Sequence, residues 1–249
     1  MSLVVRRGRR RPQVVWSDDH RLRTIGRQLE SEAGVDGSIG PVASDVASLR
    51  QIIGMLGSEG GRIFLTEGTW IFDGSLSVST KNLHLYSTSP GRTVFKRAAT
   101  STATAHMLSF TGESVIVEGI RFIDSVTSGH AAIELNGQRS IVKNCVFEDV
   151  TNGVEVAGAN WCAVRDCHFI AVGNYAIEYS GTCEGGVVTG NIIETSGGDI
   201  YLGDDVSGTV VTGNALDVGD RKISYFTGQN ISTGSALNAI GPTKVEERS

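Results

Sequence analysis

Three glutamates recur at a nearly constant step in the middle of the chain and could carry acid–base chemistry. Each lies between two apolar residues, within residues 133–135, 154–156 and 177–179. This alternation predicts short strands that are buried on one face and place the glutamate on the other. The three residues are Glu134, Glu155 and Glu178. The same outward position holds Ser109 before them and Tyr201 and Ser224 after them.

If these strands stack as neighbours, adjacent glutamates would lie about 4.8 Å apart, the spacing between strands in a sheet. A pair at that distance approaches the roughly 5–5.5 Å of a retaining glycosidase, and Glu134 and Glu178 approach the roughly 6.5–9.5 Å of an inverting one. The carboxylates could instead hold a hard cation such as Ca²⁺, or form a solvated surface row. We favour the surface row, so no catalytic residue, metal ligand or cofactor is assigned, and the three glutamates remain candidates.

A repeat of about 23 residues positions these glutamates and runs from about residue 76 to 226. A column of valines recurs at steps of 25, 22, 24 and 23 residues, and the glutamate strands follow the same period. The valines are Val117, Val142, Val164, Val188 and Val211. Two columns with one period predict an all-β chain that folds as a right-handed parallel β-helix, one coil per repeat. Coils of nearly equal length leave no long loops to build a cleft, which favours the surface row.

Three further columns of the repeat have a clear structural meaning. Two residues after each valine comes a type that tolerates positive φ, and we predict a left-handed bend there. These residues are Gly119, Asn144, Asp166, Gly190 and Gly213. The next residues should point inward, and they are Ile120, Cys145, Cys167, Asn191 and Asn214. The two asparagines should then bond each other. An apolar stack should follow, made of Phe122, Phe147, Phe169, Ile193 and Leu216.

Other residues that often carry chemistry give weaker signals. The histidines have no partner at a motif spacing, and we interpret them as surface or packing residues; they include His84, His106, His130 and His168. The four cysteines form no close CxxC pair, so we expect reduced residues of the core and turns. Three aromatic residues could contact a glycan by stacking on a sugar ring, namely Trp161, Tyr175 and Tyr201.

The segment before the repeat predicts a cover for the open end of the β-helix. Ser44 is expected to cap a helix near residues 45–57, followed by a double glycine and two short strands. Residues 45–72 resemble the opening of the pectate-lyase-like β-helix superfamily, whose members include polysaccharide lyases, glycoside hydrolases and bacteriophage tailspikes. The resemblance covers about residues 45–226, and we place the chain nearest the tailspike-like branch.

Composition divides the chain into three parts. Residues 1–40 should form a basic arm and a helix, residues 41–226 the β-helix, and residues 227–249 a cap or a segment for oligomerisation. The formal net charge is −5, yet five arginines gather in the first eleven residues. They are Arg6, Arg7, Arg9, Arg10 and Arg11. We expect this arm to anchor the chain on an acidic protein surface, and the acidic body makes nucleic acid an unfavoured partner.

Together these features favour a structural protein of a bacteriophage particle, of tailspike, tail-fibre or capsid-decoration type. The β-helix would be attached to another virion protein through its arm and could bind host surface polysaccharide, and the resemblance implies a homotrimer. Two alternatives stay open: a polysaccharide lyase or glycoside hydrolase that uses the glutamates, and a cytoplasmic scaffold or assembly protein. No signal peptide and no apolar stretch of about 20 residues is visible, so we expect synthesis in a host cytoplasm, assembly into the virion and no membrane contact.

Overall fold

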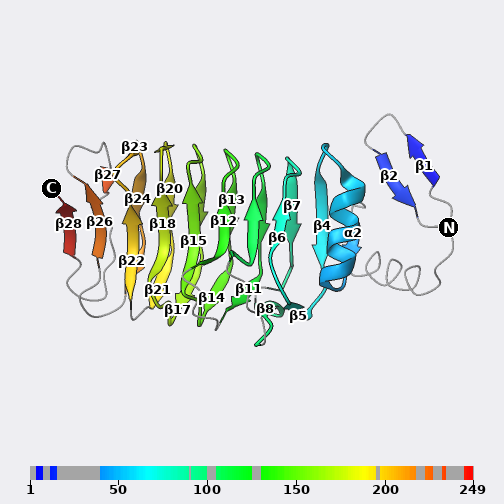
Figure 1. The fold of residues 1–249 in the computed structure, drawn as a ribbon, viewed down its shortest axis with the longest axis horizontal. Coiled ribbons are helices and arrows are strands. Elements are labelled where there is room, and N and C mark those ends of the chain that lie inside the picture. The colour runs from blue at the N-terminus through cyan, green and yellow to red at the C-terminus, as the bar shows by residue number, and fades with distance from the viewer. Residues whose placement is uncertain are drawn as a thin grey trace.

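The chain folds as a right-handed parallel β-helix, as predicted. The computed structural model describes residues 4–7, 12–15, 40–89, 91–99, 105–124, 130–194, 197–216, 222–226, 232–233 and 244–248. Three parallel sheets run along the solenoid, and Figure 1 shows their strands stacked along the long axis of the molecule. We call them sheets 1, 2 and 3, in the order in which the chain passes through them from β4 onward.

Each coil contributes one strand to each sheet. Sheet 1 contains β3 (Val42–Ala43), β4 (Gly61–Leu65), β7 (Leu83–Tyr86), β10 (Ile116–Glu118), β13 (Ile141–Lys143), β16 (Ala163–Arg165), β20 (Val187–Thr189), β24 (Val210–Thr212) and β27 (Ser232–Thr233). Sheet 2 contains β5 (Gly68–Phe72), β8 (Thr93–Arg97), β11 (Arg121–Ile123), β14 (Val146–Glu148), β17 (His168–Ile170), β21 (Ile192–Glu194) and β25 (Ala215–Leu216). Sheet 3 contains β6 (Leu76–Val78), β9 (Leu108–Phe110), β12 (Ala131–Leu135), β15 (Asn152–Ala157), β18 (Tyr175–Ser180), β22 (Gly198–Leu202), β26 (Lys222–Phe226) and β28 (Lys244–Arg248).

Two small two-stranded sheets are separate from the three parallel sheets of the solenoid. Strands β19 (Cys183–Glu184) and β23 (Val206–Ser207) pair in the turns that lead from sheet 3 to sheet 1. Strands β1 (Val4–Arg7) and β2 (Pro12–Val15) form an antiparallel hairpin in the basic arm. The side chains of the arm, and the helix expected within residues 17–32, lie outside the described residues. Strands β27 and β28 continue sheets 1 and 3 beyond residue 226, because backbone pairing does not require the side-chain pattern to continue.

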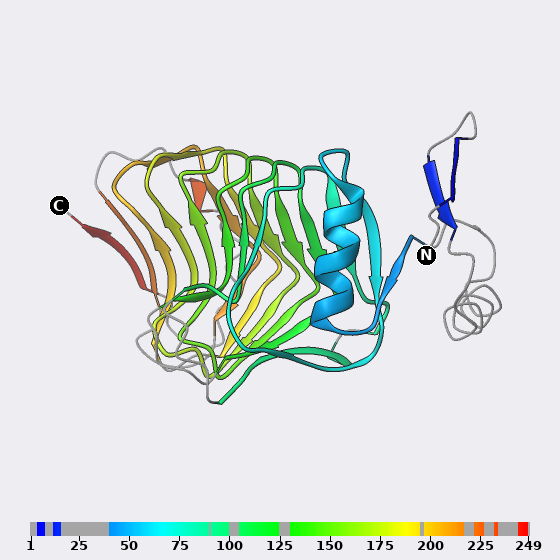
Figure 2. The same ribbon diagram turned by 45° about the vertical axis from the view of Figure 1, so that its right-hand side comes forward.

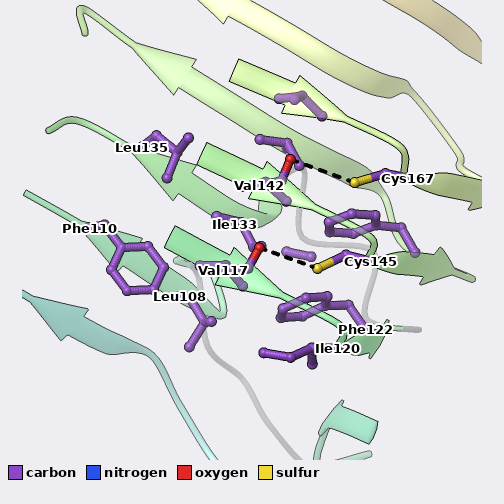
Figure 3. Close-up of a cluster of buried hydrophobic side chains, with 14 of the residues drawn as sticks. Leu108, Phe110, Val117, Ile120, Phe122, Ile133, Leu135, Val142, Cys145 and Cys167 are labelled. Atoms are coloured by element: carbon purple, nitrogen blue, oxygen red, sulfur yellow. Dashed lines mark hydrogen bonds between the residues drawn. The ribbon is translucent and has the colours of Figure 1, made fainter. Parts of the chain in front are cut away.

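The bend between sheets 1 and 2 confirms the predicted left-handed column. The five predicted residues have φ between 53° and 76°. The inward column that follows is buried in all five coils. Figure 3 shows two of its members, Cys145 and Cys167, whose thiols each lie 3.8 Å from a carbonyl oxygen one coil back, on Val117 and Val142. All four cysteines are free and buried, as predicted.

The core is a set of side-chain ladders along the solenoid axis. The rings of Phe122 and Phe147 stack at 5.1 Å, and those of Phe147 and Phe169 at 4.8 Å. At the polar end of the inward column, Asn191 Nδ2 donates to Asn214 Oδ1 at 2.9 Å, as predicted. These stacks bury apolar surface continuously from coil to coil, so each coil is stabilised by its two neighbours.

The asparagine ladder gives a direct test of the inward register. Asn214 Oδ1 also accepts from the backbone N–H of Asn191 at 3.0 Å, and Asn214 Nδ2 donates to the Val188 carbonyl at 3.0 Å. Asn214→Leu should lower the free energy of unfolding by about 1–3 kcal/mol, because it leaves buried donors and acceptors without partners. Urea unfolding of the two proteins measures this loss, and an unchanged free energy would show that the register is wrong.

Helix α2 (Val46–Leu56) covers the N-terminal end of the solenoid, as Figure 2 shows. It buries Leu49, Ile52 and Ile53 against the first coils. The predicted cap, Ser44, is wrong by one residue. Asp45 caps the helix, because its carboxylate accepts from the backbone N–H of Ser48 at 2.6 Å while Ser48 Oγ accepts from the N–H of Asp45.

Candidate functional site

The three glutamates lie on the outer face of sheet 3 in successive coils, as the repeat predicts. Glu134, Glu155 and Glu178 are direct register partners on β12, β15 and β18. We call them the Glu column. Ser109 precedes the column on β9, and Tyr201 follows it on β22.

The Glu column is not the freely solvated row that we favoured from the sequence. The side chains of Glu134 and Glu155 are only 18% and 20% exposed. Ser109 Oγ donates to Glu134 at 2.5 Å, and Ser180 Oγ donates to Glu155 at 3.0 Å. Hydrogen-bonded carboxylates held at fixed positions are suited to recognising a ligand, because less side-chain freedom is lost on binding.

His106 completes this cluster and was missed in the sequence. Its Nδ1 accepts from the backbone N–H of Ala131 at 3.1 Å, so in the neutral ring the proton lies on Nε2. Nε2 is 3.4 Å from a Glu134 oxygen, and Nδ1 is 3.9 Å from a Glu155 oxygen. The ring of His130 lies 5.1 Å from that of His106, nearly perpendicular to it. The two histidines are 24 residues apart, which is one repeat, and that spacing was the available signal.

Two other histidines also lie beside glutamates, although no motif spacing indicated these partners. His84 Nε2 lies 2.9 Å from Glu118, and His168 Nε2 lies 3.0 Å from Glu194. In both pairs the acid lies one coil further along the chain, on the same sheet. A separation of 34 or 26 residues is not a motif spacing, but it follows from the coil length once the register is known.

Glu178 differs from its neighbours in its electrostatics. Burial raises its pKa, and the nearby Glu155 raises it further, to about 7 from the usual 4.5. The neutral acid form of Glu178 is therefore substantially populated near neutral pH. Two neighbouring carboxyl groups in different protonation states can donate and accept hydrogen bonds side by side.

This raised pKa predicts a pH-dependent stability. Because the folded pKa exceeds the unfolded value, the folded state binds more protons between about pH 4.5 and 7, and stability falls as pH rises through that window. Without screening the shift corresponds to roughly 3 kcal/mol, and since Glu178 is half-buried we expect about 1–2 kcal/mol. Glu178→Gln should remove this part of the difference between pH 5 and pH 8 in chemical unfolding, whereas Glu59→Gln on the exposed turn after α2 should not. Equal pH profiles for wild type and Glu178→Gln would contradict the assignment.

The structure brings two of the three predicted glycan-contact residues together. The rings of Tyr175 and Tyr201 stack at 4.9 Å with an angle of 22° between their planes, and Tyr201 is the register partner of Glu178. Trp161 lies apart from them, in the turn that follows β15, whereas Tyr175 begins β18. Trp161 is 56% exposed and lies at the opposite edge of sheet 3 from Tyr175.

A hollow of about 330 Å³ lies elsewhere, between the start of α2 and β5. None of the Glu column residues lines it; its walls include Asp45, Arg50, Trp70 and Ile71. Among the described residues, no group of three or more histidine, cysteine, aspartate or glutamate side chains is arranged to hold a metal ion. Within the same part of the chain, no helix is long and apolar enough to cross a membrane.

Sequence comparison identifies one family. The family described as the right handed beta helix region matches residues 63–193 and 91–236. No curated protein matches the chain.

Structural comparison finds similar solved structures at low sequence identity, and the first of them shares the fold. The DFA-IIIase from Arthrobacter chlorophenolicus A6 is 15% identical with a TM-score of 0.60, over 85% of this chain and 64% of the enzyme. The chain thus spans less than two thirds of that enzyme's length. The ORF18 protein of Geobacillus virus E2 is 13% identical with a TM-score of 0.45, over 98% of this chain and 68% of that one. The pectin methylesterase from Aspergillus niger is 12% identical with a TM-score of 0.45, over 86% and 87% of the two chains.

Proposed function

This chain belongs to the right-handed β-helix family, and from that premise we propose that it is a structural protein of a virus particle that binds a host surface glycan on sheet 3. The observation that supports the proposal is the Glu column with the Tyr175–Tyr201 stack beside it. Ionised carboxylates accept hydrogen bonds from sugar hydroxyls, and aromatic rings pack against the apolar face of a sugar. The two kinds of contact lie next to each other, at Glu178 and Tyr201.

The ladder geometry favours an extended glycan that lies parallel to the solenoid axis. Carboxylates on neighbouring coils present acceptors about 4.8 Å apart along that axis. One serine hydroxyl donates to Glu134 and another to Glu155. Each carboxylate therefore keeps acceptor sites that a ligand can use. Strands β9, β12, β15 and β18 contain no lysine or arginine, so this face would repel a polyanionic glycan. The expected ligand is a neutral glycan or one with amino sugars.

The proposed place in a virus particle rests on the resemblance of residues 45–72 to tailspike-containing β-helices and on the charge distribution. The first eleven residues hold five arginines and no acid, which leaves 17 basic against 27 acidic residues in the rest of the chain. Such an arm is suited to an acidic surface on another virion protein. Tailspike, tail fibre and capsid decoration are three locations compatible with this arrangement.

A second candidate function, glycan hydrolysis, is favoured by the raised pKa of Glu178. A protonated Glu178 could donate its proton to the leaving oxygen while an ionised Glu155 attacks the anomeric carbon, and water would then release the glycosyl-enzyme intermediate. Neighbouring coils place the two side chains close to the separation that this mechanism needs.

Titration of the protein with neutral, amino-sugar and uronic-acid oligosaccharides tests both functions. The proposal predicts binding of the first two classes, weak or no binding of the third, and no new reducing ends. Release of reducing ends that disappears in Glu155→Gln would establish hydrolysis instead. If no class binds, both functions are wrong.

A further inference from the structure

An unbroken aliphatic column runs along the outer face of sheet 1. Its five residues are register partners in successive coils, namely Ile116, Ile141, Ala163, Val187 and Val210. Val187 and Val210 are 36% and 37% exposed. The other outward column of the same strands is polar throughout, with Glu118, Lys143, Arg165, Thr189 and Thr212. Both columns face away from the core, so core packing does not explain why one of them is entirely apolar.

The turn between sheets 3 and 1 extends this apolar surface. Trp161 and Gly185 occupy equivalent positions of neighbouring turns, with φ of 62° and 70°. The exposed indole of Trp161 lies over Gly185, where an added Cβ would come within 2.3 Å of the ring. Gly208 occupies the next turn, with φ of 63°. The indole therefore covers the backbone beside Val187, whereas the exposed Gly208 leaves the backbone beside Val210 bare, so that another surface can approach it closely.

We propose that this surface binds a second copy of this chain. The two solenoid axes are parallel, and a two-fold axis that runs in the same direction lies between them. The coils of one solenoid present equivalent side chains about 4.8 Å apart. A second copy has the same coil height, so the aliphatic columns of the two copies can meet coil by coil along their length. The same patch is used by both partners, which makes the contact self-complementary and closes it as a dimer.

Charges at the rim fit this arrangement. The two-fold axis reverses the order of the columns, so the polar column of one copy faces the Trp161 turn of the other at equal height. Arg165 then faces the indole of Trp161 and, one coil further, Glu184. Arg165 and Glu184 are exposed, and neither forms an ion pair within the described part of its own chain.

Two further pairs of charges near this rim are already matched within each copy. Lys143 Nζ lies 2.9 Å from Glu118, and Arg139 Nη1 lies 3.9 Å from Glu113. These pairs limit the repulsion between two identical surfaces. The contact leaves the outer face of sheet 3 open, so this inference is independent of the proposed glycan binding. It also differs from the homotrimer that the resemblance implied.

Sedimentation velocity of the full chain over a range of concentrations tests the proposal. We expect a reversible dimer of the 26.4 kDa chain. Val187→Glu would place two like charges in the contact and should raise the dissociation constant by at least about tenfold. Ile192→Glu is the matched control, because Ile192 is a β-branched residue that is 47% exposed on sheet 2. It should leave the dimer intact.

A charge exchange tests the orientation and does not depend on the folding of Val187→Glu. Arg165→Glu should weaken the dimer, and adding Glu184→Arg should restore it. A wild type that stays monomeric or forms a trimer would overturn the proposal, as would equal effects of Val187→Glu and Ile192→Glu. A double variant as weak as Arg165→Glu alone would overturn the two-fold arrangement.

Discussion

Replacing Asp124 by alanine should lower the free energy of unfolding by about 3–5 kcal/mol. Asp124 and Arg97 are both buried, and Arg97 Nε lies 2.9 Å and 2.8 Å from the two carboxylate oxygens. Arg97 Nη2 also donates to the Ala105 carbonyl at 2.9 Å, whereas Nη1 has no hydrogen-bond partner among the described residues. Removal of the carboxylate would leave a buried guanidinium without its counter-charge. Chemical unfolding at pH 7 measures the loss.

A double variant separates the charge from the packing. Arg97→Met combined with Asp124→Leu removes both charges and keeps apolar volume, so it should be more stable than Asp124→Ala alone. A loss below about 1 kcal/mol in Asp124→Ala would show that water reaches Arg97 and that the pair is not buried in solution.

Glu155→Gln should weaken the binding of a neutral or amino-sugar oligosaccharide by roughly tenfold to a hundredfold. Glu155 is the middle member of the Glu column, and the substitution removes its charge while keeping its size. Hydrogen bonds to a charged group contribute about 1.5–3 kcal/mol, which corresponds to that range of affinity. Isothermal titration calorimetry of the wild type and the variant with the oligosaccharide measures the two affinities.

Two controls make this result specific. Glu59→Gln removes the same charge from an exposed turn beyond the cover helix and should leave the affinity unchanged. Ile192→Ala trims an exposed side chain on sheet 2 and should also have no effect. Equal affinities of wild type and Glu155→Gln would contradict a binding role for the Glu column.

The repeated parts of the fold could be predicted because one backbone conformation imposes the same residue type in every coil. The bend at Asn144 needs positive φ, and the sequence supplies glycine, asparagine or aspartate at each equivalent position. The inward pairing of Asn191 with Asn214 followed from the same register. Such columns are visible in one sequence because the repeat itself acts as an internal comparison.

Features that occur once could not be found in this way. The ion pair of Arg97 with Asp124 joins residues 27 apart in a single place, and no column repeats it. The contact of His106 with Glu134 depends on where the chain enters sheet 3. The burial of the Glu column was missed for a similar reason, because outward position on a strand does not determine exposure. Serine and histidine side chains from neighbouring coils lie against two of its members, Glu134 and Glu155.

The crystal structure of this chain with its tightest-binding oligosaccharide would test the central claim most directly. We expect a glycan that lies along sheet 3, donates hydrogen bonds from its hydroxyls to Glu134 and Glu155, and packs a sugar ring against Tyr175 or Tyr201. A glycan seated instead in the hollow between α2 and β5, or on the outer face of sheet 1 or sheet 2, would contradict it.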